Sequence, residues 1–396
     1  MATLYNPSIV RNNLIINLDA ANSRSYDSRE NLLTYSTDLS WNTNNTPTKT
    51  LNAAPAPDLS NTAIKLDLDA GYEGYYTTAL TLTAGATYNF SIYVKYLSGK
   101  NILFFGCDTG NLATVNINMQ TGVATARVGS PTNIVSTNVG DGWYRVSFCL
   151  IPPTTGSYAY VIYSEDATAV SCLVWNPQVE KSATANTAVS TTTTSVTRST
   201  SVKDLSINSN NATLTNGPTY NSSNNGVFVF DGTDDYINGI HNAQLDITGD
   251  LTIECWFKIT NTRSDWVRIF GKGDSINRTY GLWYNTGTNA FLYQRYGASG
   301  SAGLIYTGEI INLNKWYHLV GTSIGSNHSL YLNGVLVSTG TGLGPFYSST
   351  STYKVGYGEI HVYHLGEVGN CKIYNTGLSS TEVFKNYNAI KGRYGL

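Results

Sequence analysis

The chain has 396 residues, which predicts two or three domains at roughly 100–200 residues per domain. Only 13% of the residues are charged and the formal net charge is −2, so the basic surface that nucleic acids or anionic membranes require is missing. The 37 glycines and 29 tyrosines, against 2 methionines, are typical of an all-β, turn-rich protein.

The first residues, MATLYNPSIVRNNL, lack the basic end and apolar core of a signal peptide. No apolar run approaches the roughly 20 residues needed to span a bilayer, so we expect neither ordinary secretion nor a membrane span. The cysteines stand far apart without metal-ligand spacing. This odd, unpatterned set predicts separate buried thiols in a chain made in a reducing cytosol: Cys107, Cys149, Cys172, Cys255 and Cys371.

The segment NLIINLDAAN (residues 13–22) has the composition of a core strand, yet ENLLTYSTDLSW (30–41) begins a different pattern almost at once. An isolated strand is not stable, so we expect this one to pair with a partner far along the chain.

Alternating strands follow in the first half of the chain. TYNFSIYVK (87–95) places Tyr88, Phe90, Ile92 and Val94 on one face, and 142–150, 157–164 and 171–180 have the same style. Trp143 is expected in the core. The tract KSATANTAVSTTTTSVTRSTS (181–201) is poor in large apolar groups and predicts a linker, with an edge strand as the alternative.

The second half continues the strand series and ends in a helix. LTIECWFKI (251–259) alternates with one face directed to a core, and SLYLNGVLVS (329–338) is a hairpin whose turn is Asn333-Gly334. At the end of the chain, Ser379 and Glu382 form a capping box, and Gly392 follows the helical pattern as a stop.

Two separated pieces carry a family resemblance. LIINLDAANSRSYDS (14–28) and SVKDLSINSNNATLTNGPTYNSSNNGVFVFDGTDDYI (201–237) resemble the opening of laminin-G-like, concanavalin-A-like sandwich domains of tailed-phage virion proteins. The segments LTIECWFKI, LNKWYHLVGTS and SLYLNGVLVSTG keep the resemblance. The ending, GNCKIYNTGLSSTEVFKNYNAIKGRYGL, is similar to endings of virion proteins of tailed phages, including those that infect cyanobacteria.

The intervening segments ENLLTYSTDLSW, TYNFSIYVKYLSG, DGWYRVSFCL and CLVWNPQVEKSATANT resemble jelly-roll, carbohydrate-binding-module-like domains of phage tail-fibre proteins. The resemblance therefore implies an all-β protein of two jelly-roll β-sandwiches with one short C-terminal helix. Residues 1–28 plus 200–396 would form a discontinuous laminin-G-like sandwich, 29–180 an inserted sandwich, and 181–199 a Thr/Ser-rich linker or edge strand.

An acidic cluster lies in FVFDGTDDYI (228–237). Asp231, Asp234 and Asp235 could contribute to a calcium site, because lectin-like sandwiches often bind calcium at loops. Calcium needs six to eight oxygens, however, which one short segment does not supply. A structural turn at Asp231-Gly232 is the favoured interpretation, and calcium is the alternative cofactor.

Catalysis has little support in the sequence. The Glu-x-Asp-x-x-Glu strand that marks glycosidases of the concanavalin-like fold is absent, as is a Gly-x-Ser-x-Gly elbow, and the adjacent Asp234 and Asp235 would point to opposite faces of a strand. We therefore expect that the protein is not an enzyme. The histidines (His241, His318, His328, His361 and His364) are expected to be solvated or partner-facing rather than metal ligands.

Aromatic residues are the candidates for binding, because tyrosine and tryptophan combine a large apolar ring with a polar group. A sugar-stacking face or a subunit contact could use Tyr72, Tyr75, Tyr76, Tyr280, Trp283, Tyr284, Tyr293 and Tyr296. The competing interpretation is that these rings pack within the sandwiches, as tyrosines in strands commonly do.

The resemblance implies a non-enzymatic virion surface protein of a tailed phage, made in the host cytoplasm, with capsid or tail proteins as partners. The chain has no repetitive shaft, so a capsid decoration or head-fibre protein is favoured, docked through MATLYNPSIV. The alternatives are a tail-fibre receptor-binding lectin for host polysaccharide and, less favoured, a capsule depolymerase. No heptad stalk is present, so a homo-oligomer such as the trimers common in phage appendages would assemble through sandwich faces or this arm.

Overall fold

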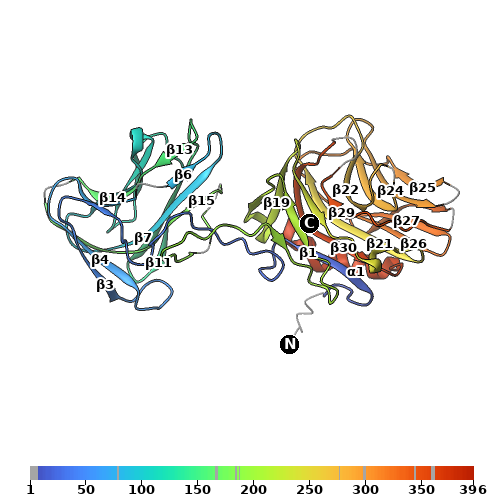
Figure 1. The fold of residues 1–396 in the computed structure, drawn as a ribbon, viewed down its shortest axis with the longest axis horizontal. Helices are drawn as coiled ribbons and strands as arrows, with labels where there is room; N and C mark the ends of the chain where they lie inside the picture. Colours follow the sequence, from blue (N-terminus) through green and yellow to red (C-terminus); the bar gives the residue numbers. More distant parts are fainter. Residues whose placement is uncertain are drawn as a thin grey trace. The chain divides into compact units, whose positions relative to one another are not determined.

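The computed structural model describes residues 8–77, 80–165, 168–182, 185–186, 188–275, 277–297, 300–342, 345–357 and 362–396. The chain forms two compact units (Figure 1): unit 1 comprises Met1–Ser28 and Ser199–Leu396, and unit 2 comprises Arg29–Arg198. Strands and isolated bridges make up 51% of the described residues, which confirms the predicted all-β class with two-sheet sandwiches and a short C-terminal helix.

Unit 1 is a sandwich of two large sheets. Its first sheet contains, in order, β18 (Thr219–Asn221), β19 (Val227–Asp231), β30 (Leu365–Tyr374), β21 (Leu251–Ile259), β26 (Trp316–Ile324), β27 (Asn327–Leu332) and β28 (Val335–Thr341), and β1 (Leu14–Asp19) pairs with β30. Its second sheet contains β16 (Ser201–Val202), β17 (Ala212–Thr215), β20 (Tyr236–Gly239), β29 (Tyr353–Val355), β22 (Val267–Lys272), β23 (Tyr280–Asn285), β24 (Ala290–Gly297) and β25 (Gly300–Tyr306).

The core of unit 1 lies between these sheets and follows the period-2 pattern of the strands. The predicted inward face of β21 is confirmed: Ile253, Cys255 and Phe257 are buried among core residues of both sheets. The opposite face of β21 is buried as well, because Trp256 packs with Trp316 of β26 and with Tyr394 near the C-terminus. The first sheet therefore has apolar contacts on both faces.

The N-terminal strand β1 finds the distant partner that the sequence predicted. It pairs antiparallel with β30, so that Leu18 lies opposite Cys371. Its outer edge is bonded by side chains, because Asp204 accepts from the Asn17 N–H at 2.8 Å and Asn210 donates to the Ile15 carbonyl at 2.8 Å. Ser206 and Asn208 donate to the Ile15 and Leu14 carbonyls in the same way, which leaves this edge strand few open backbone groups.

The two chain segments that connect unit 1 to unit 2 are hydrogen-bonded to each other within unit 1. Tyr26 and Val202 form an antiparallel β-bridge, and the Ser199 N–H donates to the Asp27 carbonyl at 3.3 Å. The Lys203 N–H donates to the Ser25 carbonyl at 2.7 Å. The point at which residues 29–198 are inserted is therefore closed by hydrogen bonds within unit 1.

Unit 2 is a second sandwich, with its own core that includes the predicted face of Tyr88, Phe90, Ile92 and Val94. One sheet contains β10 (Ala124–Gly129), β9 (Ala113–Asn118), β8 (Ile102–Cys107), β14 (Tyr160–Ser164), β5 (Glu73–Tyr76) and β2 (Asn42–Asn44). The other contains β11 (Thr132–Gly140), β12 (Trp143–Leu150), β7 (Tyr88–Gly99), β15 (Val170–Glu180), β4 (Ala63–Leu68) and β3 (Thr48–Ala54), and β6 (Leu80–Leu82) pairs with β13 (Gly156–Tyr158).

The Thr/Ser-rich tract is not a free linker over its described residues. Asn31 and Val196 exchange backbone hydrogen bonds of 2.8 and 2.9 Å, and Thr191 is buried with its N–H donating to Ser36 Oγ at 2.8 Å. Thr191 Oγ1 also accepts from the Ser36 N–H at 3.2 Å and donates to the Leu33 carbonyl at 2.8 Å, so this part of the tract is bonded to residues 31–36. Among the described residues of the tract, Val196 forms an isolated bridge with Asn31, and Ser201 begins β16, which lies at the edge of the second sheet of unit 1.

The helix and hairpin predicted from local signals are both confirmed. Helix α1 (Ser380–Ile390) begins with the Ser379–Glu382 capping box and buries Val383. The hairpin between β27 and β28 turns at Asn333 and Gly334, which have φ of 51° and 79°, the positive values a type I′ turn needs. Single-turn 3₁₀ segments complete the structure: Thr109–Asn111, Ser223–Asn225, Ala243–Leu245 and Lys391–Tyr394.

Two other expectations can be compared with the structure. All five cysteines are buried thiols, as expected, but Cys255 and Cys371 are not separate, because they are partners across β21 and β30. Across the part of the chain that the structure describes, every helix is too short or too polar to cross a membrane.

Candidate functional site

A groove lies on the outer face of the second sheet of unit 1, over β23, β24 and β25. Cross-strand pairing puts Trp283, Leu292 and Ile305 in one row, because Trp283 lies opposite Leu292 and Leu292 opposite Ile305. Gln294 pairs with Gly303, and each lies two residues away from Leu292 or Ile305 on its strand, so this pair lies on the same face as the row. The groove has a volume of about 460 Å³, and its lining is Asp265, Trp266, Arg278, Trp283, Leu292, Gln294, Ser301, Gly303 and Ile305.

Trp283 forms one wall of the groove and is held from two directions. It is 5% exposed, and the guanidinium carbons of Arg268 and Arg278 lie 5.5 and 5.4 Å from its ring centroid. Arg268 Nε donates to the Tyr357 carbonyl at 3.3 Å, and Arg278 Nη1 donates to the Tyr296 hydroxyl at 2.7 Å. These bonds fix the two guanidinium groups and therefore the indole between them.

The indole N–H of Trp283 is a buried donor without an acceptor in the described structure. It lies over the backbone of Gly281, where an added Cβ would come within 3.1 Å of Nε1. An unsatisfied buried donor of this kind costs the fold about 1–3 kcal/mol.

The groove is hollow because Gly303 has no side chain. A Cβ at this position would be in ordinary contact with Leu292 Cδ1, at 3.5 Å, so the space above Gly303 is open to a ligand. Gln294 and Ser301 add polar groups beside the apolar Leu292 and Ile305. An apolar surface with a few placed polar groups is the composition of small-molecule sites in general.

The aromatic residues predicted for binding in unit 1 divide between the two faces of the sheet. Trp283 and Tyr296 lie on the outer face, but Tyr280, Tyr284 and Tyr293 point into the core and are at most 3% exposed. Their hydroxyls bond inside the sandwich, to the Leu245 carbonyl, His364 Nδ1 and Ser323 Oγ at 3.0, 3.3 and 2.6 Å. A sugar-stacking role for these three tyrosines is therefore wrong.

The predicted aromatic residues of unit 2 do not form one face either. Tyr72 is 55% exposed, whereas Tyr75 is 3% exposed and donates to the Pro47 carbonyl at 3.2 Å, so it belongs to the core. Tyr76 is half-buried against Tyr163 and lines a pocket of about 220 Å³ together with Trp41. Trp41 was not among the predicted residues, because nothing in its local sequence marks it as surface-facing.

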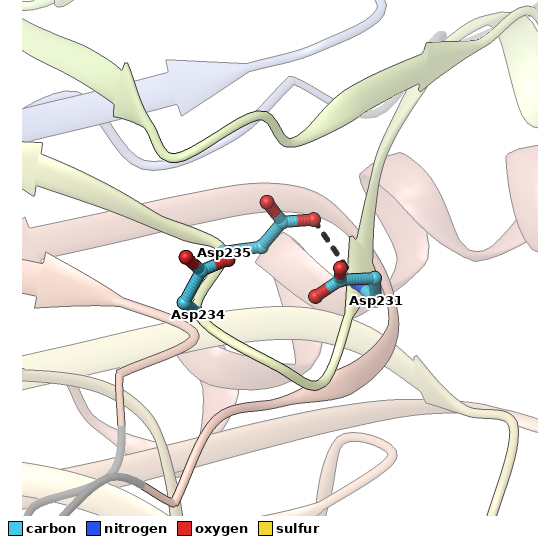
Figure 2. A group of neighbouring side chains, drawn as sticks. All are labelled: Asp231, Asp234 and Asp235. Atoms are coloured by element: carbon cyan, nitrogen blue, oxygen red, sulfur yellow. Dashed lines mark hydrogen bonds between the residues drawn. The ribbon is translucent and has the colours of Figure 1, made fainter. Parts of the chain in front are cut away.

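The three aspartates lie together in the turn between β19 and β20 (Figure 2). One carboxylate oxygen from each lies within 4.8 Å of the others, and Asp231 and Asp234 are exposed. Asp235 is buried and accepts from the Asp231 N–H at 3.0 Å, and Asp231 accepts from the Thr233 N–H at 2.7 Å. The carboxylates thus stabilise the turn, as the favoured interpretation states. In the described chain no other group of three His, Cys, Asp or Glu side chains is close enough to share a metal ion.

Three of the histidines differ from the prediction that they face solvent or a partner, because His318, His328 and His364 are at most 2% exposed. His241 is exposed, as predicted, and His361 lies outside the described residues. His364 is enclosed between the sheets next to Phe230 and Phe257.

We predict that the buried His364 makes unit 1 sensitive to mild acid. Burial lowers the pKa of His364 to about 3, whereas an unfolded histidine titrates near 6.5. Below pH 6.5 the unfolded chain binds a proton that the folded chain does not, so the free energy of unfolding falls by up to about 1.4 kcal/mol per pH unit. His364 should contribute about 1–2 kcal/mol to the difference between urea unfolding at pH 7 and at pH 5, and His318 and His328, whose pKa values burial also lowers, should add to it. The difference should shrink in His364→Leu and persist in His241→Leu; equal differences in all three proteins would refute the assignment.

Part of unit 1 matches a family of known proteins. Residues 231–384 match the Laminin_G_3 family model, described as the concanavalin A-like lectin/glucanases superfamily. This match lies within unit 1 and contains the whole groove. Unit 1 therefore has the lectin-like jelly-roll fold that the sequence predicted. A search of curated proteins finds no match.

Several solved structures are similar over about half of the chain. The binding domain of Paraclostridial Mosquitocidal Protein 1 is 16% identical with a TM-score of 0.41, covering 48% of this chain and 49% of that one. The receptor binding domain of botulinum neurotoxin C/D mosaic serotype and the binding domain of serotype D are each 17% identical with TM-scores of 0.41, covering 47% of this chain and 48% of theirs. The chain thus spans about half the length of these proteins, and likenesses of this size give no information on its ligand.

Proposed function

We propose that the protein is a non-enzymatic binding protein whose unit 1 binds a glycan in the groove beside Trp283. The observation that carries this proposal is the combination of an apolar row, Trp283–Leu292–Ile305, with hydrogen-bonding groups around it. A sugar ring presents apolar C–H faces and hydroxyls together, which fits both kinds of lining. The lectin-type family match of residues 231–384 supports the same ligand class.

Binding is a better account of the groove than hydrolysis. A glycosidase needs two carboxyl groups, one on each side of the scissile bond, at about 5–10 Å from each other. Among the described residues that line the groove, Asp265 is the one carboxylate, and it is exposed and accepts from the Trp266 N–H at 2.7 Å. A capsule depolymerase is therefore the least supported alternative.

We propose further that the protein belongs to the virion surface of a tailed phage, is made in the host cytoplasm, and contacts other virion proteins. This rests on the sequence resemblance of residues 1–28 and 200–396 to phage virion proteins. A capsid decoration or head-fibre protein remains the favoured location, and a tail-fibre lectin for host polysaccharide the alternative. Antibody labelling of intact particles in the electron microscope distinguishes the two, because it marks either the heads or the tails.

Filling the groove should abolish glycan binding without unfolding the protein. Gly303→Val places a branched side chain on the floor of the groove at a strand position where a Cβ meets no backbone atom, so we expect binding on a glycan array to weaken at least tenfold. Thr339→Val on β28 is the matched control, an exposed strand position of the first sheet.

The two variants should have the same thermal stability to within a few degrees, which separates loss of the groove from loss of the fold. Equal binding by Gly303→Val and Thr339→Val would show that any glycan site lies elsewhere. Release of reducing ends from host polysaccharide by the unmodified protein would replace the binding proposal by the depolymerase alternative.

Calcium is a separate proposal, for the turn of Asp231, Asp234 and Asp235. These carboxylates supply three of the six to eight oxygens that calcium needs, so backbone carbonyls and water would have to supply the others. If calcium binds, millimolar calcium raises the melting temperature by a few degrees in the unmodified protein and in Asp141→Asn, an exposed aspartate of unit 2, but not in Asp234→Asn. The same response to calcium in Asp234→Asn would end this proposal.

A further inference from the structure

Cys255 and Cys371 face each other across the middle of the first sheet of unit 1. They are directly opposite on the antiparallel strands β21 and β30, and their Sγ atoms are 3.5 Å apart. Directly opposed residues have Cα atoms about 4.5 or 5.5 Å apart, and both values lie within the range of about 4.4–6.8 Å that disulfides span. Small side-chain rotations, rather than a rearranged sheet, therefore bring the two sulfurs to bonding distance.

We propose that Cys255 and Cys371 form a disulfide when the protein meets a low-molecular-weight disulfide such as oxidised glutathione. One cysteine thiolate attacks a glutathione sulfur, forms a mixed disulfide and releases one reduced glutathione. The second cysteine thiolate then attacks the protein sulfur of the mixed disulfide and releases the second glutathione. The two thiol protons pass through solvent to the two released glutathione thiolates, so the atoms and electrons balance.

The position of the other thiols makes this pairing specific. Unit 1 contains only Cys255 and Cys371, whereas Cys107, Cys149 and Cys172 belong to unit 2. The two cysteines of unit 1 are also in the same core, next to residues such as Ile253 and Leu18. Folding of unit 1 thus brings its two thiols together and leaves the remaining three to a different core.

Burial determines when the bond can form. Cys255 is fully buried and Cys371 is 2% exposed, so a glutathione-sized oxidant does not reach them in the folded protein. Burial also raises the pKa of the Cys255 thiol, which makes its reactive thiolate scarce at neutral pH. Oxidation should therefore be fast during folding and slow once the sandwich has closed.

The bond would join two central strands that are 116 residues apart in the sequence. Since β30 also holds β1 and β19, the bond would fix the strand on which the first sheet is organised. A cross-link over so long a segment restricts the unfolded chain, and we expect a rise in melting temperature of roughly 5–15 °C.

The test refolds the full chain from urea with oxidised or reduced glutathione, unfolds the product again in urea with iodoacetamide so that every free thiol is blocked, and maps the peptides by mass spectrometry. We expect a linked peptide pair containing Cys255 and Cys371, with the other three cysteines alkylated, and slow linkage when oxidised glutathione is added to folded protein. Cys371→Ala should lose the linked pair and the rise in melting temperature, and Cys107→Ala, a buried cysteine of unit 2, should keep both.

A second readout covers the case in which Cys371→Ala does not fold. The unmodified protein, refolded with oxidised glutathione, should lose part of its thermal stability when the bond is reduced in the presence of urea and the protein is refolded again. The proposal is overturned if Cys255 and Cys371 are alkylated as fully as Cys107 after oxidative refolding, or if the principal disulfide joins other cysteines.

Discussion

Replacing Lys372 with methionine should destabilise unit 1 by about 3–5 kcal/mol, because it leaves the carboxylate of Glu254 buried without its counter-ion. Lys372 Nζ lies 2.7 Å from Glu254 Oε1, and both side chains are fully buried. His318 Nε2 lies 3.2 Å from the same oxygen, and Asn386 donates to the other carboxylate oxygen at 2.7 Å. The remaining contacts are too few to compensate for a lost charge at this depth.

The pH dependence gives an independent check on this ion pair. Burial alone would raise the pKa of Glu254, but Lys372 and His318 outweigh it and hold the pKa at about 2. A carboxylate with a lowered pKa stabilises the fold above its unfolded value, near 4.5, and this stabilisation is lost as the pH falls toward 2. In Lys372→Met the pKa of Glu254 should rise above its unfolded value, so acid should relieve the cost of burying the unpaired carboxylate, and the difference in stability between the variant and the unmodified protein should narrow as the pH falls.

Urea unfolding at pH 7 measures the effect. The double variant Glu254→Gln/Lys372→Met should recover part of the stability, because a neutral amide costs less to bury than an unpaired carboxylate. Arg24→Ala, an exposed site, is the control and should change the free energy of unfolding by less than about 0.5 kcal/mol. If Lys372→Met lowered the free energy of unfolding by less than about 0.5 kcal/mol, the ion pair of Glu254 and Lys372 would have to be open to water.

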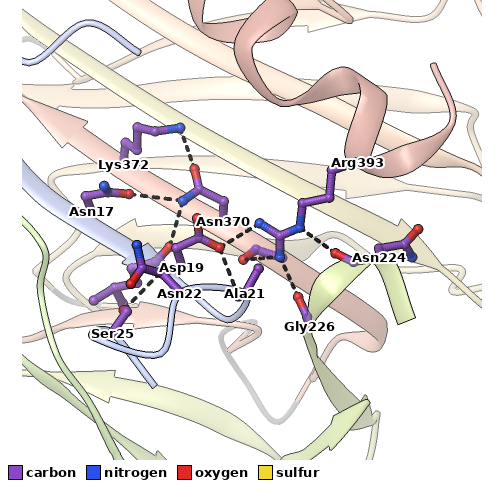
Figure 3. A network of polar contacts seen from close by, with 12 residues as sticks. Asn17, Asp19, Ala21, Asn22, Ser25, Asn224, Gly226, Asn370, Lys372 and Arg393 are labelled. Atoms are coloured by element: carbon purple, nitrogen blue, oxygen red, sulfur yellow. Dashed lines mark hydrogen bonds and ion pairs between the residues drawn. The ribbon is translucent and has the colours of Figure 1, made fainter. Parts of the chain in front are cut away.

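Arg393→Ala should cost about 2–4 kcal/mol, since one guanidinium joins both ends of unit 1 (Figure 3). Its Nη1 lies 2.6 Å from Asp19 Oδ1 at the end of β1, and its Nε donates to the Asn224 carbonyl at 2.6 Å. It also donates to the carbonyls of Gly226 and, at 3.5 Å, Gly369. The alanine variant would leave a carboxylate and several carbonyls without this donor.

The Arg393→Lys variant separates the contribution of the positive charge from that of the guanidinium geometry. Arg393→Lys keeps the positive charge beside Asp19 but has no planar fork to reach several carbonyls at once. We therefore expect Arg393→Lys to recover less than half of the loss, measured as the midpoint of urea unfolding. Full recovery would mean that the ion pair with Asp19 alone accounts for the effect.

Local sequence signals predicted the elements of this fold well. The alternation in LTIECWFKI, the Asn333-Gly334 turn and the Ser379–Glu382 capping box each depend on neighbouring residues, and the structure has all three. The pairing of β1 could also be anticipated, because a lone strand requires a partner.

The candidate site was harder to predict, because it depends on which side of a strand a residue occupies. Tyr284 and Trp283 are neighbours in the sequence, yet one lies in the core and the other on the groove. Gly303, Gln294 and Trp283 belong to three different strands and carry no local motif, so only strand pairing brings them to one face. The opposition of Cys255 and Cys371 is non-local in the same way, and spacing along the chain gave no sign of it.

The hydrogen bonds that close the insertion point have a consequence for how this protein can change. Tyr26 pairs with Val202, and the Ser199 N–H donates to the Asp27 carbonyl, so both sides of this hairpin stem belong to unit 1. Residues 29–198 occupy the position of the loop of that hairpin. A short turn or an unrelated domain with adjacent termini could occupy that loop without altering the stem. The inserted domain can therefore be exchanged without changing unit 1. The groove of unit 1 and the inserted domain can evolve, or be engineered, independently of each other.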